Sequence, residues 1–130
     1  MKPVHIGLLG LGTVGGGTAR VLKDNAAEIA RRAGREIQVV HAAARGLEGK
    51  VPEGVGGSTL TEDAFEVVAN PDVDIVVELI GGDSPARELV LEAIANGKHV
   101  VTANKALIAK HGNEIFAAAQ EKGVVVAFEA

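Results

Sequence analysis

Residues 4–15 read VHIGLLGLGTVG, a short apolar run that ends in a glycine-rich turn. The run has the length of one buried strand. After Thr13 the apolar residues recur at spacings of three, four and seven, which predicts a helix. Gly10, Gly12 and Gly15 fit the pattern G-x-G-x-x-G. Between a predicted strand and a predicted helix, this pattern is typical of a turn that binds the pyrophosphate of a dinucleotide.

Each glycine of the turn has a physical task. Gly10 permits the tight turn out of the strand, Gly12 lets a phosphate approach the backbone, and Gly15 lets the helix pack closely on the strand. The N–H groups of the first helical turn, together with the helix dipole, attract an anion. A tight turn without a ligand is the alternative. The predicted cofactor-binding residues here are Gly10, Leu11, Gly12, Thr13, Val14 and Gly15.

Strand and helix patterns alternate along the rest of the chain. Strands are predicted at 4–9, 37–44, 73–80, 99–102 and 124–128, and residues 45–60 are predicted to form a surface loop. Helices are predicted at 13–33, at 61–69, after an N-cap at Ser84 with Pro85 in the first helical position, and at 104–122 with an interruption near His111-Gly112. This alternation predicts an α/β fold of the Rossmann type, with a mostly parallel sheet and helices on both faces.

Composition narrows the class of protein. The chain has 130 residues, 47% of them hydrophobic, which suits a single domain with a substantial core. The net charge of -4 argues against nucleic acid or an anionic membrane surface as a partner. Cysteine is absent, so disulfides and cysteine-based metal sites are excluded. Because neither a signal-peptide pattern nor a membrane-spanning apolar run is present, we expect a cytoplasmic protein.

Arg45 follows the second predicted strand, 30 residues after Gly15. A site selective for NAD usually has an acidic residue near this position, which binds the ribose 2′-hydroxyl. Arginine instead suits the 2′-phosphate of NADP and stacks on adenine. The residue therefore favours NADP over NAD. An exposed loop arginine is the alternative, with Glu48 serving as the acid.

Two further segments follow strands at the edge where such sheets bind ligands. Thr102, Ala103, Asn104 and Lys105 lie where a strand gives way to a helix, and Lys105 in the first turn opposes the helix dipole. A lysine in that position could face ligand phosphates or a polar substrate, and a solvated surface lysine is an equally good alternative. Ile80 ends the preceding predicted strand, and Gly81 and Gly82 after it leave room for a nicotinamide ribose, although an ordinary turn would look the same. All three are predicted cofactor-binding residues.

Glu78 lies inside the apolar strand before Ile80, where a buried carboxylate needs a partner. The sequence assigns it no role. The four histidines are scattered and form no metal-binding cluster.

Residues 10–15, 77–82 and 97–107 together resemble the amino-terminal half of homoserine dehydrogenase. The Thr-Ala-Asn-Lys segment is more distinctive of this family than the glycine-rich turn. The resemblance implies an oxidoreductase that interconverts L-homoserine and L-aspartate 4-semialdehyde with NAD(P), on the route to threonine and methionine. It also implies that Thr13, Val14 and Arg45 contact the cofactor phosphates and adenosine, and that Lys105 lies near nicotinamide and substrate. Glu129 matches a position that helps to coordinate a structural sodium ion in this family.

The family's substrate-binding and dimerisation region, with its main acid/base residues, corresponds to sequence beyond residue 130. We therefore expect residues 1–130 to form the NAD(P)-binding domain of a longer, homodimeric enzyme, and to be inactive alone. Three alternatives stay open: another amino-acid dehydrogenase or reductase, a non-catalytic nucleotide-sensing Rossmann domain, and a structural α/β domain without a ligand.

Overall fold

The computed structural model describes residues 4–10, 37–43, 59–78, 80, 85–102 and 104–128. Within these residues, six strands form one sheet in the order β3-β2-β1-β4-β5-β6, and every neighbouring pair is parallel. The strands are β1 (Val4–Leu9), β2 (Ile37–Ala43), β3 (Thr59–Thr61), β4 (Ile75–Glu78), β5 (His99–Thr102) and β6 (Val126–Phe128). The described helices are α3 (Ala64–Ala69), α4 (Ala86–Ala95) and α5 (Lys105–Lys122). This strand order is that of a Rossmann fold, as predicted.

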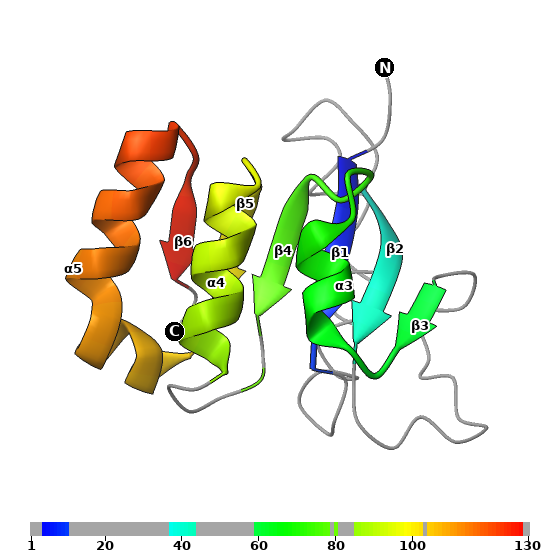
Figure 1. The fold of residues 1–130 in the computed structure, drawn as a ribbon, viewed down its shortest axis with the longest axis horizontal. Coiled ribbons are helices and arrows are strands. Elements are labelled where there is room, and N and C mark those ends of the chain that lie inside the picture. The colour runs from blue at the N-terminus through cyan, green and yellow to red at the C-terminus, as the bar shows by residue number, and fades with distance from the viewer. Residues whose placement is uncertain are drawn as a thin grey trace.

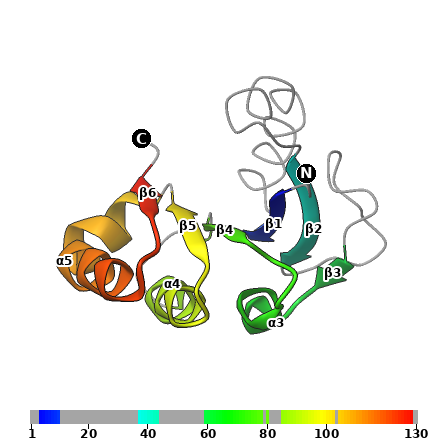
Figure 2. The same ribbon diagram turned by 90° about the horizontal axis from the view of Figure 1, so that it is seen from above.

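The three described helices form one layer on one face of the sheet. Figure 2 shows α3, α4 and α5 on the same side of the row of strands, with α4 between the other two. Their apolar side chains meet those of β1, β4 and β5 in a core of aliphatic residues, which includes Leu9, Val67, Val76, Leu89, Ile94, Val100, Leu107 and Ile115. In β1, Ile6 and Leu8 point away from these helices and are also buried. Side chains on both faces of β1 are therefore buried. The predicted helix 13–33 lies outside the described residues.

Helix α3 packs closely on β1 because Gly7 has no side chain. A Cβ atom at this position would lie 2.5 Å from Cγ1 of Val67 and 3.0 Å from Cγ1 of Val73. These are buried valines, one on α3 and one in the turn that follows it. Gly7 thus sets the distance between this helix and the sheet.

A buried lysine ties the end of α3 to the start of β5. Lys98 is only 4% exposed, and its ammonium donates to the carbonyl oxygens of Asn70 at 2.6 Å and Val73 at 2.9 Å. Burial lowers the pKa of Lys98 from its ordinary value of 10.5, whereas Asp74 and Asp72 act in the opposite direction. These contacts satisfy carbonyl groups beyond the end of the helix, where a cation is favourable.

The structure corrects several predicted boundaries. Residues 59–60, predicted as part of a loop, begin the edge strand β3, which exists because β2 supplies its hydrogen-bonding partner. Helix α3 starts at Ala64 instead of 61, because the carboxylate of Asp63 accepts a hydrogen bond from Phe65 N–H and caps the helix. Strand β4 covers only part of 73–80, and β6 begins at Val126 instead of 124.

Two predictions about helices were also wrong. Pro85 is the N-cap of α4 and not its first helical residue, while Ser84 lies outside the described residues. Helix α5 continues without a break through His111 and Gly112, since a single glycine weakens a helix without ending it. The helix ends at Lys122, as predicted, and its C-cap is Gly123, whose φ of 76° is left-handed.

Candidate functional site

The carboxyl ends of the six described strands lie at one edge of the sheet, because all their pairings are parallel. In Figure 1 the arrowheads of β2, β4 and β6 point to the lower edge of the view, where α4 and α5 also begin. Strand order reverses between β1 and β4, which are neighbours in the sheet although β2 and β3 separate them in the sequence. In open α/β sheets such a reversal forms the crevice that binds ligands. The candidate site is therefore the edge at the ends of β1, β4 and β5.

Gly10 turns the chain away from the end of β1. Its φ of 97° lies in the region that favours glycine, and its N–H donates to the carbonyl oxygen of Ala43 at 2.7 Å. The turn is thus anchored to the end of β2. This geometry supports the task predicted for Gly10.

Glu78 is the feature of this edge to which the sequence assigned no role. It is the last residue of β4, pairs in register with Leu9 and Thr102, and is fully buried at 0% exposure. Its Oε1 accepts a hydrogen bond from the Thr102 hydroxyl at 2.7 Å, and its Oε2 accepts one from Ile80 N–H at 2.8 Å. The partner expected for a buried carboxylate is therefore present. The sequence signal was an acidic residue in an apolar strand, but the partner on β5 is visible only in the fold.

Thr102 and Asn104 shape the start of α5. The Thr102 hydroxyl oxygen accepts a hydrogen bond from Asn104 N–H at 3.0 Å, and both residues are buried. Asn104 is the N-cap of α5, and its side-chain oxygen accepts a hydrogen bond from Leu107 N–H at 3.0 Å. These two predicted site residues therefore orient the helix start through their own side chains.

Lys105 is the first residue of α5, which confirms its predicted place in the first helical turn, and its side chain is exposed. Ile80, with an exposure of 36%, lies just beyond β4. Gly10, Ile80, Thr102, Asn104 and Lys105 all follow or end strands at the same sheet edge. The other predicted site residues, Leu11, Gly12, Thr13, Val14, Gly15, Arg45, Gly81, Gly82, Ala103 and Glu129, lie outside the described residues.

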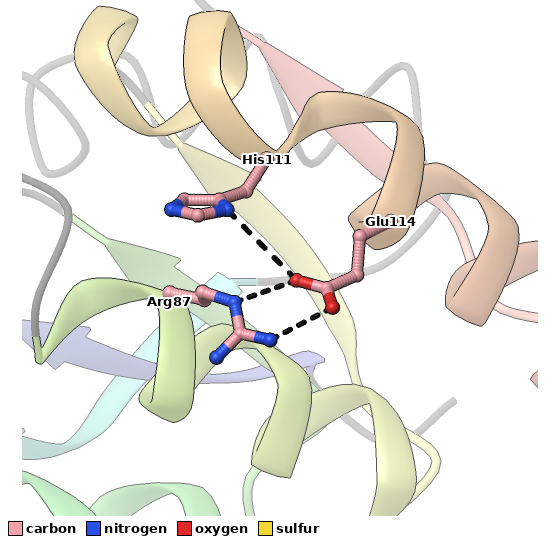
Figure 3. Close-up of polar contacts among 3 residues, drawn as sticks. All are labelled: Arg87, His111 and Glu114. Carbon is pink, nitrogen blue, oxygen red and sulfur yellow. Dashed lines mark hydrogen bonds and ion pairs between the residues drawn. The ribbon is translucent and has the colours of Figure 1, made fainter.

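A second polar cluster lies between α4 and α5. Arg87 donates two hydrogen bonds to the carboxylate of Glu114, at 2.6 Å and 2.7 Å, and His111 Nδ1 lies 4.0 Å from Oε1 of Glu114 (Figure 3). The hydrogen bond raises the pKa of Arg87 and lowers the pKa of Glu114. Both side chains are partly exposed, so the pair contributes little to stability.

This cluster lines a cleft of about 720 Å³, with Ile108, Gly112 and Phe116 along its α5 wall. None of the residues predicted to bind a cofactor lines it, and its arginine is already paired with Glu114. The cleft is therefore not the candidate site.

The described part of the chain has neither a metal-binding cluster nor a membrane-spanning helix. It contains no group of three or more histidine, aspartate or glutamate side chains able to hold a metal ion. Its helices include none that is both long and apolar enough to cross a membrane.

Comparison with known proteins points to one family. The family model described as homoserine dehydrogenase, NAD binding domain, matches residues 10–129. The homoserine dehydrogenase of Pseudomonas aeruginosa is 65% identical over 130 residues, which are 100% of this chain and 30% of that protein. That of Neisseria gonorrhoeae is 58% identical over the same span. The chain thus spans about 30% of the length of these curated relatives.

Solved structures agree with the sequence comparison. A homoserine dehydrogenase from Thiobacillus denitrificans superposes with a TM-score of 0.89 at 69% identity, over 99% of this chain and 30% of that one. One from S. aureus gives a TM-score of 0.88 at 38% identity, over 100% of this chain and 33% of that one. An NAD binding oxidoreductase from Klebsiella pneumoniae, at 23% identity and a TM-score of 0.81, shares the fold alone. The matched domain identifies a nicotinamide dinucleotide as the ligand class.

Proposed function

Because the chain belongs to the homoserine dehydrogenase family, as its NAD-binding domain, we propose that it holds the cofactor in an enzyme that interconverts L-homoserine and L-aspartate 4-semialdehyde. The reaction lies on the route to threonine and methionine. The observation that carries the proposal is the place of Thr102, Asn104 and Lys105. This family-like segment begins at the carboxyl end of β5, on the same sheet edge as Gly10.

The described edge fits a dinucleotide. Gly10 supplies a turn without a side chain at the reversal of strand order, and Ile80 and Lys105 lie exposed beyond β4 and β5. Residues 10–15 would hold the pyrophosphate, and residues 80–82 and 102–105 would hold the nicotinamide half. The bound cofactor supplies the hydride chemistry, while the protein binds and orients it. Lys105 would face the nicotinamide and the substrate.

The finer assignments extend this proposal. Arg45 favours NADP over NAD, since a guanidinium pairs with a 2′-phosphate. Glu129 would contribute one ligand to a sodium site. The substrate-binding and dimerisation region would belong to the remainder of a cytoplasmic, homodimeric enzyme, because the relatives are about three times as long as this chain.

Calorimetric titration of residues 1–130 with NADP⁺ and NAD⁺ tests the cofactor proposal. We expect both to bind, NADP⁺ more tightly, and Arg45→Ala to weaken NADP⁺ much more than NAD⁺. Lys122→Ala removes the same charge at the far end of α5 and serves as the control. Equal losses for both nucleotides would remove Arg45 from the 2′-phosphate role, and no binding of either would refute the cofactor proposal.

Enzyme turnover tests whether residues 1–130 bind the cofactor while catalysis needs the remainder of the enzyme. Residues 1–130 should show no homoserine-dependent reduction of NADP⁺, whereas a full-length enzyme carrying this domain should show it. Lys105→Ala in that enzyme should lower kcat/KM for homoserine. A loss confined to nucleotide affinity would instead favour a nucleotide-sensing domain, and an ordinary enzyme rate from residues 1–130 would refute the proposed division.

A further inference from the structure

Glu78 joins the exits of two neighbouring strands through one carboxylate. Oε2 accepts a hydrogen bond from the N–H of Ile80, the described residue beyond β4, and Oε1 accepts one from the hydroxyl of Thr102, the last residue of β5. Thr102 in turn accepts a hydrogen bond from Asn104 N–H at the start of α5. One side chain therefore links the backbone just beyond β4 to the last residue of β5 and, through Thr102, to the start of α5.

The location of these contacts suggests what they serve. A dinucleotide lies across the reversal of strand order, with its two halves over the two halves of the sheet. Strand β2, to which the Gly10 turn is anchored, lies on one side of β1, and β4 and β5 lie on the other. If the adenosine half lies toward β2, where Arg45 follows, the nicotinamide half lies over the ends of β4 and β5. Glu78 lies beneath that half.

We propose that Glu78 is a positioning residue for the nicotinamide half of the dinucleotide, acting through Ile80 and Thr102. Its full burial means that it acts by holding these two residues and not by touching the ligand. The inference rests on the proposed function, because it takes the dinucleotide from there.

The hydrogen-bond pattern explains why a carboxylate is required. The N–H of Ile80 can only donate, and the Thr102 hydroxyl donates to Glu78 while its oxygen accepts from Asn104. A carboxylate accepts at both oxygens and satisfies both donors. The amide of Glu78→Gln has one oxygen and one NH₂ group. If the oxygen stays on Ile80, the NH₂ group faces Thr102, whose hydroxyl proton then loses its acceptor. An isosteric change therefore leaves a buried hydroxyl proton without its acceptor and weakens the link to β5.

Two nucleotides that differ only in the nicotinamide ring provide the test. NADP⁺ and the 2′-phosphate of ADP-ribose share the adenosine half, the pyrophosphate and the second ribose. In residues 1–130, Glu78→Gln should weaken NADP⁺ about tenfold, as expected for the loss of a hydrogen bond to a charged group, and should weaken the ring-free nucleotide much less. Glu92→Gln, an exposed position in the middle of α4, makes the same chemical change away from this edge and should alter neither affinity.

Substitutions at Thr102 test the same positioning role of Glu78 without a change of charge. Thr102→Val removes the hydroxyl with little change of shape and should reproduce the selective loss, whereas Thr102→Ser keeps the hydroxyl and should retain more NADP⁺ affinity. This pair applies even if Glu78→Gln fails to fold.

The outcomes separate this inference from the proposed function. Equal losses for the two nucleotides, or no loss for either, would overturn the positioning role while leaving the cofactor proposal standing. Failure of the unsubstituted chain to bind either nucleotide would overturn both.

Discussion

Gly7 shows how a single missing side chain sets the spacing between two layers. The space that its Cβ would occupy is filled by Val67 and Val73, both buried. These valines are stiff, since branching at Cβ restricts their rotamers. The close approach of α3 and β1 therefore leaves no room for a larger residue at this position.

Gly7→Ala should destabilise the chain by about 1–3 kcal/mol, the usual cost of overpacking a core. Urea denaturation of the two proteins at one temperature measures this difference. Gly7→Ala combined with Val67→Ala should recover part of the loss, because it removes the nearer clashing methyl group. An unchanged midpoint in the single variant would contradict the prediction.

The hydrogen bonds of the Lys98 ammonium stabilise the fold, whereas the burial of its charge destabilises it. Its donors satisfy two carbonyl groups, but its cation is buried. Lys98→Met keeps the apolar stem and should destabilise the chain by about 1–3 kcal/mol near neutral pH, because carbonyl oxygens lose a charged donor. Chemical denaturation of both proteins measures this loss.

The pH dependence of Lys98 follows from its lowered pKa. Below the folded-state pKa the ammonium is charged in both states. Between that value and 10.5 the unfolded chain binds more protons than the folded chain, so stability rises with pH. The stability advantage of the parent over Lys98→Met should therefore grow as the pH rises through the window that ends at 10.5. An advantage that shrinks in this window would show that burial does not lower the pKa of Lys98.

At the scale of elements, helix α5 begins at the candidate site and also contains a glycine, a residue type that destabilises helices. Its start is fixed by the Asn104 cap, and its interior contains Gly112, which is buried. A Cβ at Gly112 would meet Cγ2 of Ile108 at 3.5 Å and Cε2 of Phe116 at 3.9 Å, which is ordinary contact. The helix therefore tolerates a larger residue at this position.

Gly112→Ala should stabilise the chain by about 0.5–1 kcal/mol, because alanine loses less backbone entropy than glycine in a helix. Gly7→Ala is the same chemical change, but we expect it to lower stability and Gly112→Ala to raise it. Urea denaturation compares the two variants. Nucleotide affinity should not change, since Gly112 lies along the cleft between α4 and α5 and away from the predicted site. A loss of stability would mean that the cleft wall cannot accept one methyl group.

At the scale of the whole molecule, strand order determines which backbone groups are protected. Strands β1 and β4 each have a partner on both sides, whereas β3 and β6 end the sheet and have three residues each. The last residues of β1 and β4 also lie at the reversal that defines the candidate site. The most protected part of the sheet thus supports the proposed cofactor crevice.

Hydrogen–deuterium exchange followed by mass spectrometry should reflect this order. Peptides from β1 and β4 should exchange most slowly among the described strands, and those from β3 and β6 fastest, because edge strands open at low free energy. Addition of NADP⁺ should slow exchange further around residues 9–10 and 78–80. Protection of β6 equal to that of β1 would contradict this arrangement.

Local pattern was enough to predict the architecture. The apolar run of β1, the turn at Gly10, the place of Lys105 in the first turn of α5 and the end of that helix at Lys122 depend on residues near one another in the sequence. Chain order and right-handed crossovers then lead to a parallel sheet. Glycine freedom, helix capping and apolar spacing act over a few residues, so the sequence alone determined these features.

Contacts between distant segments decided the rest. Strand β3 exists through pairing with β2, Glu78 has its partner 24 residues away, and Lys98 reaches carbonyl groups 25 and 28 residues away. No local pattern predicts such pairs, because their energy appears only when the chain brings them together. The sequence alone predicted a cofactor-binding edge, because that prediction rests on local patterns, and only the tertiary structure showed that a buried carboxylate links the ends of two of its strands.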